Sequence, residues 1–263
     1  MAQDVTLPAG GATLRPLTYD VCGVAIAALR PMSAAATVVA AATAGTSYEV
    51  HLCNAYTLSL VGRDRPLAEA LGRADLNLPD GAPVAWLGRR WGTAGPVRGP
   101  SLVGDVAALG VRAGVRHYFY GGAEGVADLV ATRLAAHAPG LVVAGTETPP
   151  YTDLTDLELD QLAERIDASG ATAVWIGIGT PRQDYLVPLL AARVKAVVVP
   201  VGAAFDFWSG RVAEAPAVLH GSGVEWAYRF YREPARLWKR YFFGNPRFVW
   251  ETARHRWAGG GRR

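Results

Sequence analysis

The sequence predicts an α/β protein: a Rossmann-like parallel-sheet sandwich followed by a C-terminal helical appendage that is basic and aromatic. Two observations carry this prediction. Short apolar runs alternate with helical patterns over residues 21–208, and the composition changes beyond that point. The chain has 263 residues, 51% of them hydrophobic, and a folded chain of this length buries roughly 70–75% of its unfolded surface. We therefore expect a poorly ordered lead-in over residues 1–20, a Rossmann-like domain over 21–208 and an appendage over 209–263.

The alternation follows the order of parallel βαβ units. Near-continuous apolarity, typical of strands covered on both faces, predicts strands over residues 48–53, 117–120, 141–145, 173–178 and 196–201. The segments around them predict helices over 33–43, 65–74, 126–137, 156–168 and 181–193. Ser33 is expected to cap the first helix, and Asp153 or Thr155 the fourth.

The basic residues of the chain are concentrated in the appendage. From Arg211 to the end there are 11 Lys and Arg against 4 Asp and Glu, a balance of +7, while residues 1–210 carry 15 against 19. The same segment holds 11 aromatic residues. It predicts a helix from Gly223 to Tyr231 and a second one beginning at Glu233-Pro234. Their basic and aromatic stripes suit an anionic surface with an apolar interior; the basic residues are Arg229, Arg232, Arg236 and Arg240.

Several classes of site are not indicated. Cys22 and Cys53 lie in apolar stretches without metal or disulfide spacing, so we expect buried thiols in a reducing compartment. The five histidines match no zinc spacing, and GxSxG is absent. The N-terminal segment lacks the regions of a signal peptide, and the most apolar stretch, residues 186–205, is interrupted by Arg193, Lys195 and Pro200. We expect neither export nor a membrane-spanning helix.

Two polar residues are expected at the carboxyl edge of the sheet, where α/β folds bind ligands. Asp80 stands in Pro-Asp-Gly before an apolar run, and a carboxylate there could act as a general base on a hydroxyl group. Pro-Asp-Gly is also an ordinary turn sequence, and the motif alone favours that structural interpretation. Asn54 ends the strand over 48–53, and its amide could reach a sugar hydroxyl or cap a helix.

A glycine-rich loop, Gly121-Gly122, follows one predicted strand and precedes a helix. Such a loop can cradle an anion, because backbone N–H groups approach a phosphate at the start of the helix. The loop lacks the full GxGxxG and GxxxxGK[ST] patterns of nicotinamide and ATP sites. A tight turn without a ligand explains these glycines equally well.

A second loop of this kind begins at Gly177. Thr180 could simply cap the following helix with Pro181 at its first position. Capping leaves Arg182 and Gln183 unexplained, and these side chains fit a loop that binds diphosphate, uridine or sugar hydroxyls, together with Gly179 and Thr180.

Two charged residues stand in unusual contexts. Arg98, in Gly-Pro-Val-Arg-Gly-Pro, could hold a diphosphate through two parallel hydrogen bonds, although a lone arginine is more often solvated. Asp206, in Ala-Ala-Phe-Asp-Phe-Trp, lies in an apolar context. It is either hydrogen-bonded for structural reasons or functional, because a buried carboxylate must be satisfied in both cases.

These motifs resemble, in the same order, the WecB/TagA/CpsF glycosyltransferases of glycosyltransferase family 26. The resemblance runs from about Val21 to Phe248 through HLCNAYTL, ADLNLPDGAPVAWLGRR, VRGPSLVGDV, FYGGAEGV, WIGIGTPRQDYL, VPVGAAFDFWSG and GVEWAYRFYREPARLWKRYFFGN. It implies an inverting, metal-independent enzyme without a cofactor that moves a sugar from a UDP-sugar onto an undecaprenyl-diphosphate-linked saccharide. Such enzymes build teichoic acids, enterobacterial common antigen and exopolysaccharides.

The resemblance assigns roles to individual residues. It makes Asp80 the general base, places Asn54, Arg98 and Gln183 in the pocket, and puts Gly121-Gly122 and Gly179-Thr180 on the nucleotide side. It likens the appendage to one that closes over the site and docks on the inner leaflet of the cytoplasmic membrane, where Arg229, Arg232 and Arg236 would meet headgroups or the acceptor diphosphate. Leu52 stands where the family often has threonine.

Two other functions stay open at this point. A nucleotide-sugar oxidoreductase or epimerase would share the fold, and a membrane-peripheral binder of polyprenyl-linked saccharides would share the appendage. Nucleic-acid binding is not expected, since no recognised motif accompanies the basic charge. The sequence leaves homo-oligomer formation open.

Overall fold

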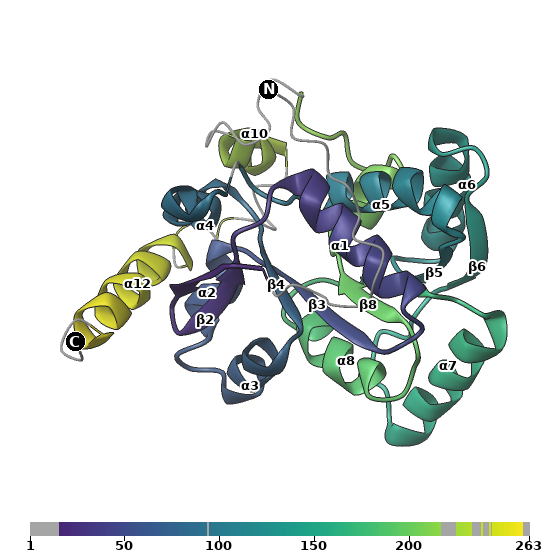
Figure 1. Cartoon of the computed structure of the whole chain (residues 1–263), viewed down its shortest axis with the longest axis horizontal. Helices are drawn as coiled ribbons and strands as arrows, with labels where there is room; N and C mark the ends of the chain where they lie inside the picture. The colour runs from purple at the N-terminus through teal and green to yellow at the C-terminus, as the bar shows by residue number, and fades with distance from the viewer. Residues whose placement is uncertain are drawn as a thin grey trace.

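The computed structural model describes residues 16–93, 95–216, 225–232, 238, 242 and 244–259. At its centre lies a six-stranded sheet in which every neighbouring pair is parallel, in the order β4-β3-β8-β7-β5-β6 (Figure 1). The strands are β3 (Tyr48–Cys53), β4 (Leu76–Pro79), β5 (Arg116–Gly121), β6 (Val142–Glu147), β7 (Ala173–Gly177) and β8 (Val197–Pro200). The predicted Rossmann-like parallel sheet is confirmed.

Helices cover both faces of the sheet (Figure 1). One face packs on α1 (Pro31–Thr43), α5 (Gly99–Ala113) and α6 (Val126–His137), and the other on α7 (Asp156–Ser169) and α8 (Arg182–Ala191), with α3 (Arg65–Arg73) beside α8. Shorter helices follow the carboxyl ends of strands: α2 (Ala55–Leu60), α4 (Ala82–Leu87), η1 (Arg89–Trp91) and α9 (Ala204–Trp208). The first turns of α2, α4 and α9 therefore lie at the carboxyl edge of the sheet.

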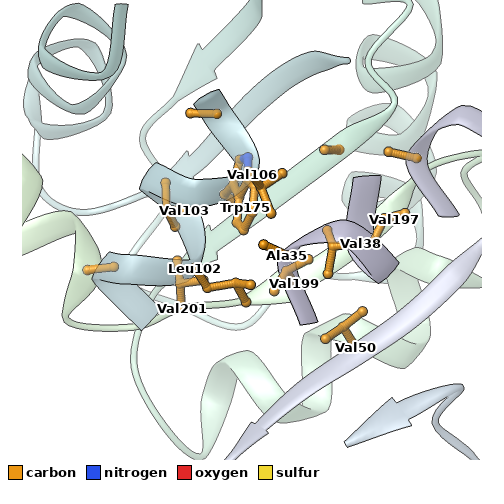
Figure 2. Close-up of a cluster of buried hydrophobic side chains, with 14 of the residues drawn as sticks. Ala35, Val38, Val50, Leu102, Val103, Val106, Trp175, Val197, Val199 and Val201 are labelled. Carbon is orange, nitrogen blue, oxygen red and sulfur yellow. The ribbon is translucent and has the colours of Figure 1, made fainter. Parts of the chain in front are cut away.

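The alternation of side chains along each strand builds two cores. In β7, Trp175 belongs to the cluster with α1 and α5, while its neighbours Val174 and Ile176 belong to the cluster with α7 and α8. Figure 2 shows Trp175 beside Val103 and Val106 of α5. Both faces of the strand are buried, which is why β7 reads as a continuous apolar run.

Helix caps test the local predictions. Thr155 caps α7 in a complete capping box with Glu158, as one of the two expected alternatives. The prediction for Ser33 is wrong, because α1 begins at Pro31, whose fixed φ suits the first turn. The alternative that Thr180 caps α8 does not hold, since Pro181 occupies the cap position and no side chain caps the helix.

A two-stranded antiparallel sheet, β1 (Thr18–Val21) and β2 (Val24–Ala27), packs beside β4. It begins at Thr18, so residues 18–20 of the expected lead-in belong to a strand. Together with α2 and α3 it forms a third apolar cluster that receives Phe248 from the C-terminal α12 (Asn245–Gly259). Figure 1 shows α12 at the β1–β2 side of the molecule.

The appendage contains α10 (Glu225–Arg232), close to the predicted first helix, and α12, which the sequence did not predict. The start of the predicted second helix at Glu233-Pro234 lies outside the described residues, as do Arg236 and Arg240. Among the described residues no helix has both the length and the apolarity needed to cross a bilayer. Cys22 and Cys53 are buried free thiols, as expected.

Candidate functional site

The strands β3 and β8 are paired over a short length. Their ladder contains the pairs Tyr48↔Val197 and Glu49↔Val198, whereas β3 pairs with β4 from Val50 to Cys53. Beyond Glu49 the last four residues of β3 therefore run on without a partner on the β8 side. The ladder between β3 and β8 thus stops before the carboxyl edge of the sheet, the usual position of ligands in this fold class. We call this unpaired stretch of β3 the opening.

Asn54 and Asp80 lie together on one side of this opening. The backbone N–H of Asp80 donates to the carbonyl of Cys53 at 3.0 Å, which places the two residues next to each other. The Asn54 amide Nδ2 then lies 3.5 Å from Asp80 Oδ2. Its Oδ1 accepts the N–H of Thr57 at 3.0 Å, so the same side chain caps α2. Capping and orienting Asp80 are compatible because they use opposite ends of one amide.

Arg98 lies beside this pair. The N–H of Val97 donates to the carbonyl of Pro79 at 2.8 Å, so the residues that precede Arg98 and Asp80 are directly bonded. Arg98 is only 7% exposed. Its guanidinium forms an ion pair with Glu214 Oε1 at 2.7 Å and donates to Ser101 Oγ at 3.3 Å. The alternative of a solvated arginine does not apply, and a buried guanidinium at this edge of the sheet is suited to an anionic group.

The start of α5 fills the base of the opening. A Cβ on Gly99 would meet the carbonyl of Val201 at 3.0 Å and Leu52 Cδ1 at 3.4 Å. The first turn of α5 thus lies against the end of β3 on one side and the end of β8 on the other. Leu52, which stands where the resemblance implies a threonine, is buried in this contact and offers no hydroxyl to a ligand.

Gln183 organises the loop on the other side of the opening. It is buried, its Oε1 accepts the N–H of Gly179 at 3.1 Å, and its Nε2 lies 3.4 Å from Thr180 Oγ1. Gly202, at the end of β8, lies against the same amide. Gly179 has φ +82° and open space around its Cβ position, so a ligand can approach its backbone closely.

Gly121 and Gly122 have a structural explanation. A Cβ on Gly121 would lie 2.6 Å from the Cα of Gly177, so the ends of β5 and β7 touch backbone to backbone. The N–H of Gly122 donates to the carbonyl of Gly177 at 3.1 Å. The loop therefore sits at the same edge of the sheet as Gln183, but the Gly122 amide is already engaged.

Arg182 and Asp206, both predicted to bind substrate, have structural partners of their own. Arg182 points away from Gln183: its guanidinium forms an ion pair with Asp153 at 3.0 Å and donates to the Thr152 carbonyl at 2.9 Å. Asp206 lies in the first turn of α9, half-buried, and its carbonyl accepts the N–H of Val212 at 3.1 Å. It helps to fold the chain segment that carries Glu214.

Arg229 and Arg232 belong to α10, but their side chains are outside the described part of the chain, and Arg236 lies outside it altogether. Within that part, no group of three or more His, Cys, Asp or Glu is arranged to hold a metal ion.

A buried polar network lies beneath the opening. His51 is fully buried, with Nδ1 3.3 Å from Asp184 Oδ1 and Nε2 3.0 Å from Glu49 Oε1. Burial lowers the pKa of His51, but the hydrogen bonds and charges of the two carboxylates outweigh it and raise the pKa overall. Burial also raises the pKa of the Cys53 thiol well above its ordinary value, with the charges of Asp184 and Asp80 adding to the effect. Cys53 is therefore a neutral thiol next to the site.

Comparison with known proteins decides the family. A family model described as "Glycosyl transferase WecG/TagA/CpsF family" matches residues 19–262. The chain belongs to this family. It is also similar to an N-acetylglucosaminyldiphosphoundecaprenol N-acetyl-beta-D-mannosaminyltransferase of Bacillus spizizenii, with 29% identity over 70% of each chain. A protein with the same description from Bacillus subtilis shares 26% identity over 68% of each chain. The protein is thus a glycosyltransferase, as its resemblance implied.

Sequence reasoning missed three side chains that shape the site. Glu214 is far from Arg98 in the sequence, and no local pattern connects them. Ser101 follows Arg98 by one helical turn, a spacing that places both on one face of α5. His51 alternates with Glu49 in an otherwise apolar strand, and this alternation was a usable indication that one face of the strand is polar.

Proposed function

We propose that this glycosyltransferase moves a hexose or N-acetylhexosamine from a UDP-sugar onto an undecaprenyl-diphosphate-linked saccharide, with inversion at the anomeric carbon. The observation that carries the proposal is the Asn54–Asp80 pair beside the buried Arg98, at the carboxyl edge of the sheet in a member of this family. The activities for which the Bacillus relatives are named support an N-acetylhexosamine as the sugar transferred and a diphosphoundecaprenol-linked N-acetylglucosamine as the acceptor.

Asp80 is the general base of the proposed reaction. It takes the proton of an acceptor hydroxyl while that oxygen forms a bond to the anomeric carbon of the donor. The bond from the anomeric carbon to the diphosphate oxygen breaks, and UDP leaves with its electron pair. Asn54 supports this role, since its amide lies beside Asp80 Oδ2 at 3.5 Å and its other end is fixed by the cap of α2.

Arg98 stabilises the departing diphosphate. A desolvated guanidinium interacts strongly with the charge that develops on the leaving group, and the diphosphate replaces Glu214 as its ionic partner. Gln183, Gly179 and Thr180 bind the nucleotide side of the donor through amide, hydroxyl and backbone groups. In this scheme cationic and dipolar groups of the chain carry out the charge stabilisation, and the reaction needs no bound metal.

The proposed acceptor is held by a membrane, and the appendage offers a surface for it. Trp250 and Trp257 on α12 are 64% and 83% exposed, although α12 itself packs on α2. Tryptophan side chains favour the boundary between lipid headgroups and acyl chains. We place the enzyme at the inner leaflet of the cytoplasmic membrane, with the arginines of α10 near the headgroups or the acceptor diphosphate.

A panel of UDP-sugars tests the proposed function. Purified full-length protein is mixed with each UDP-sugar and a short-chain polyprenyl-diphosphate-linked N-acetylglucosamine, and UDP release is measured together with the mass of the lipid product. We expect release that depends on the acceptor and a product heavier by one sugar. Acceptor binding without UDP release would favour a non-catalytic binder, and an altered UDP-sugar without transfer would favour an epimerase or oxidoreductase. Either result would overturn the proposal.

A further inference from the structure

The His51–Asp184 hydrogen bond joins strand β3 to helix α8, which packs on the sheet beside it. His51 lies on β3, two residues beyond the last pair with β8 and three residues before Asn54. Asp184 lies in the first turn of α8, directly after Gln183. The bond therefore joins the strand that carries the Asn54–Asp80 pair to the helix that carries the Gln183 loop, at a level where the two strands no longer share backbone hydrogen bonds.

The environment of Asp184 commits its carboxylate to this bond. Asp184 is 1% exposed, and its Oδ2 has no hydrogen-bond partner among the residues that the structure describes. His51 is itself held from behind, because its Nε2 is 3.0 Å from Glu49 Oε1 and the N–H of Glu49 donates to Asp75 Oδ2 at 2.8 Å. A buried carboxylate is fixed strongly by its one charged partner, because losing that partner leaves the charge unsatisfied in a low-dielectric environment.

We propose that His51 is a positioning residue: through Asp184 it sets the place of Gln183 and the Gly179–Thr180 backbone relative to Asp80. His51 touches no reacting atom in this scheme. It fixes where the nucleotide-binding loop lies relative to the base, and a displaced loop loses contacts to the donor, which raises the KM. The inference rests on the proposed function, since it concerns how donor and base are brought together.

Two isosteric substitutions separate the two nitrogens of the ring. In His51→Asn the side-chain amide lies near the position of Nδ1 and can still bond Asp184. In His51→Gln the amide reaches the position of Nε2 and can bond Glu49 but not Asp184. Both variants remove the imidazole and its charge, so a merely structural role of the ring predicts equal effects. The positioning role predicts that the KM for the UDP-sugar rises at least about tenfold in His51→Gln and less than about threefold in His51→Asn, because uniform binding is lost while the base is retained.

Asp184→Ala tests the same bond from its other end. It should reproduce the KM increase of His51→Gln, and the double variant should be no worse than either single variant, because both changes remove one interaction. If the His51 variants do not fold, Asp184→Ala decides alone: a KM unchanged from the wild type overturns the proposal. Equal KM values for His51→Asn and His51→Gln also overturn it.

Hydrogen exchange provides a readout that does not require catalysis. The Gly179 N–H donates to Gln183 Oε1, so amide protection over residues 178–186 reports the order of the loop. We expect faster exchange there in His51→Gln than in His51→Asn at equal global stability. A wild-type protein that neither binds UDP nor releases it would refute the proposed function but leave this exchange difference intact. Identical exchange in both variants, with an active wild type, would refute the positioning role alone.

Discussion

Asn54 holds Asp80 with one end of its amide and the start of α2 with the other: Nδ2 lies 3.5 Å from Asp80 Oδ2, and Oδ1 accepts the N–H of Thr57 at 3.0 Å. The position of the proposed base is thus fixed by a helix cap. This relationship makes the two functions of Asn54 separable by mutation.

Asn54→Ala removes both interactions, whereas Asn54→Asp keeps an oxygen for the cap. We expect Asn54→Ala to lower the free energy of unfolding by about 1 kcal/mol, as for other lost caps, and to reduce turnover. Asn54→Asp should keep its stability within a few tenths of a kcal/mol, yet lose turnover because a second carboxylate faces Asp80. Urea unfolding and UDP-release rates measure the two effects, and full turnover in Asn54→Asp would contradict the assigned contact.

Asp80→Asn should abolish proton transfer without disturbing donor binding. We expect turnover to fall by about 10²–10⁴-fold, the usual contribution of a positioned general base, while the Kd for UDP changes less than threefold. Isothermal titration with UDP and product formation under saturating donor give the two numbers. Unchanged turnover would eliminate Asp80 as the base.

Arg98→Lys keeps the positive charge but loses the planar fork of the guanidinium. A hydrogen bond to a charged group contributes about 1.5–3 kcal/mol, so UDP binding should weaken about 10- to 100-fold. Glu214→Gln is the matched partner: it removes the carboxylate that lies 2.7 Å from the same guanidinium, and should strengthen UDP binding because a competing anion is gone. Weaker UDP binding by Glu214→Gln would show that Glu214 orients Arg98 rather than competing for it.

His117 makes stability depend on pH. It is fully buried, accepts the Nε1–H of Trp175 at 3.0 Å through Nδ1, and burial lowers its pKa to about 4. Protonation therefore favours the unfolded chain, in which the pKa is near 6.5. The contribution of neutral His117 is complete above pH 6.5 and is lost as pH falls towards 4, at up to about 1.4 kcal/mol per pH unit and about 3 kcal/mol in total.

His117→Asn isolates this effect, because its carbonyl can still accept from Trp175 but cannot titrate. Urea unfolding between pH 4.5 and 7.5 should show a shallower loss of stability on acidification in the variant. His51 contributes with the opposite sign, since its raised pKa gives stability that is lost as pH rises. The contribution of His51 is the same in the wild type and in His117→Asn, so it cancels when their stabilities at each pH are subtracted. Parallel pH curves for the two proteins would refute the assignment to His117.

The exposed tryptophans of α12 should contribute to membrane binding. Replacing Trp250 and Trp257 by alanine removes apolar side chains worth about 2 kcal/mol each when buried, so we expect binding to vesicles of anionic lipid to weaken at least tenfold. Tyr151→Ala is the control, because Tyr151 is 92% exposed but lies outside the appendage. Sedimentation with vesicles measures both proteins, and equal binding by the two would argue against α12 as the contact.

Local sequence patterns predicted the parts of the fold that depend on local physics. The strands β3, β5, β7 and β8 are apolar runs because they are buried, whereas β6 at the edge of the sheet is partly exposed although its sequence is equally apolar. Thr155 caps α7 through a box contained within four residues. β4 was missed because Leu76–Pro79 is short and includes a polar residue and a proline. α12 was missed because its exposed face carries tryptophans, which blurs the amphipathic pattern.

The site was predictable where it depends on strand ends. Asn54 and Asp80 follow neighbouring parallel strands, so their proximity follows from topology. The environment of Arg98 was not predictable, because Glu214 approaches it from a distant segment that folds back through α9. The direction of Arg182 was equally hidden, since its partner Asp153 lies in the loop before α7.

The two-pair ladder between β3 and β8 has a practical consequence for inhibitors. A compound that occupies only the nucleotide side, such as a UDP mimic, would leave the Asp80 side unengaged. A bisubstrate compound that joins a uridine diphosphate mimic to an acceptor-like sugar would contact both sides, and its two halves would gain effective concentration from their linkage. The linker length that gives the tightest binding would then report the distance between Asp80 and the Gln183 loop.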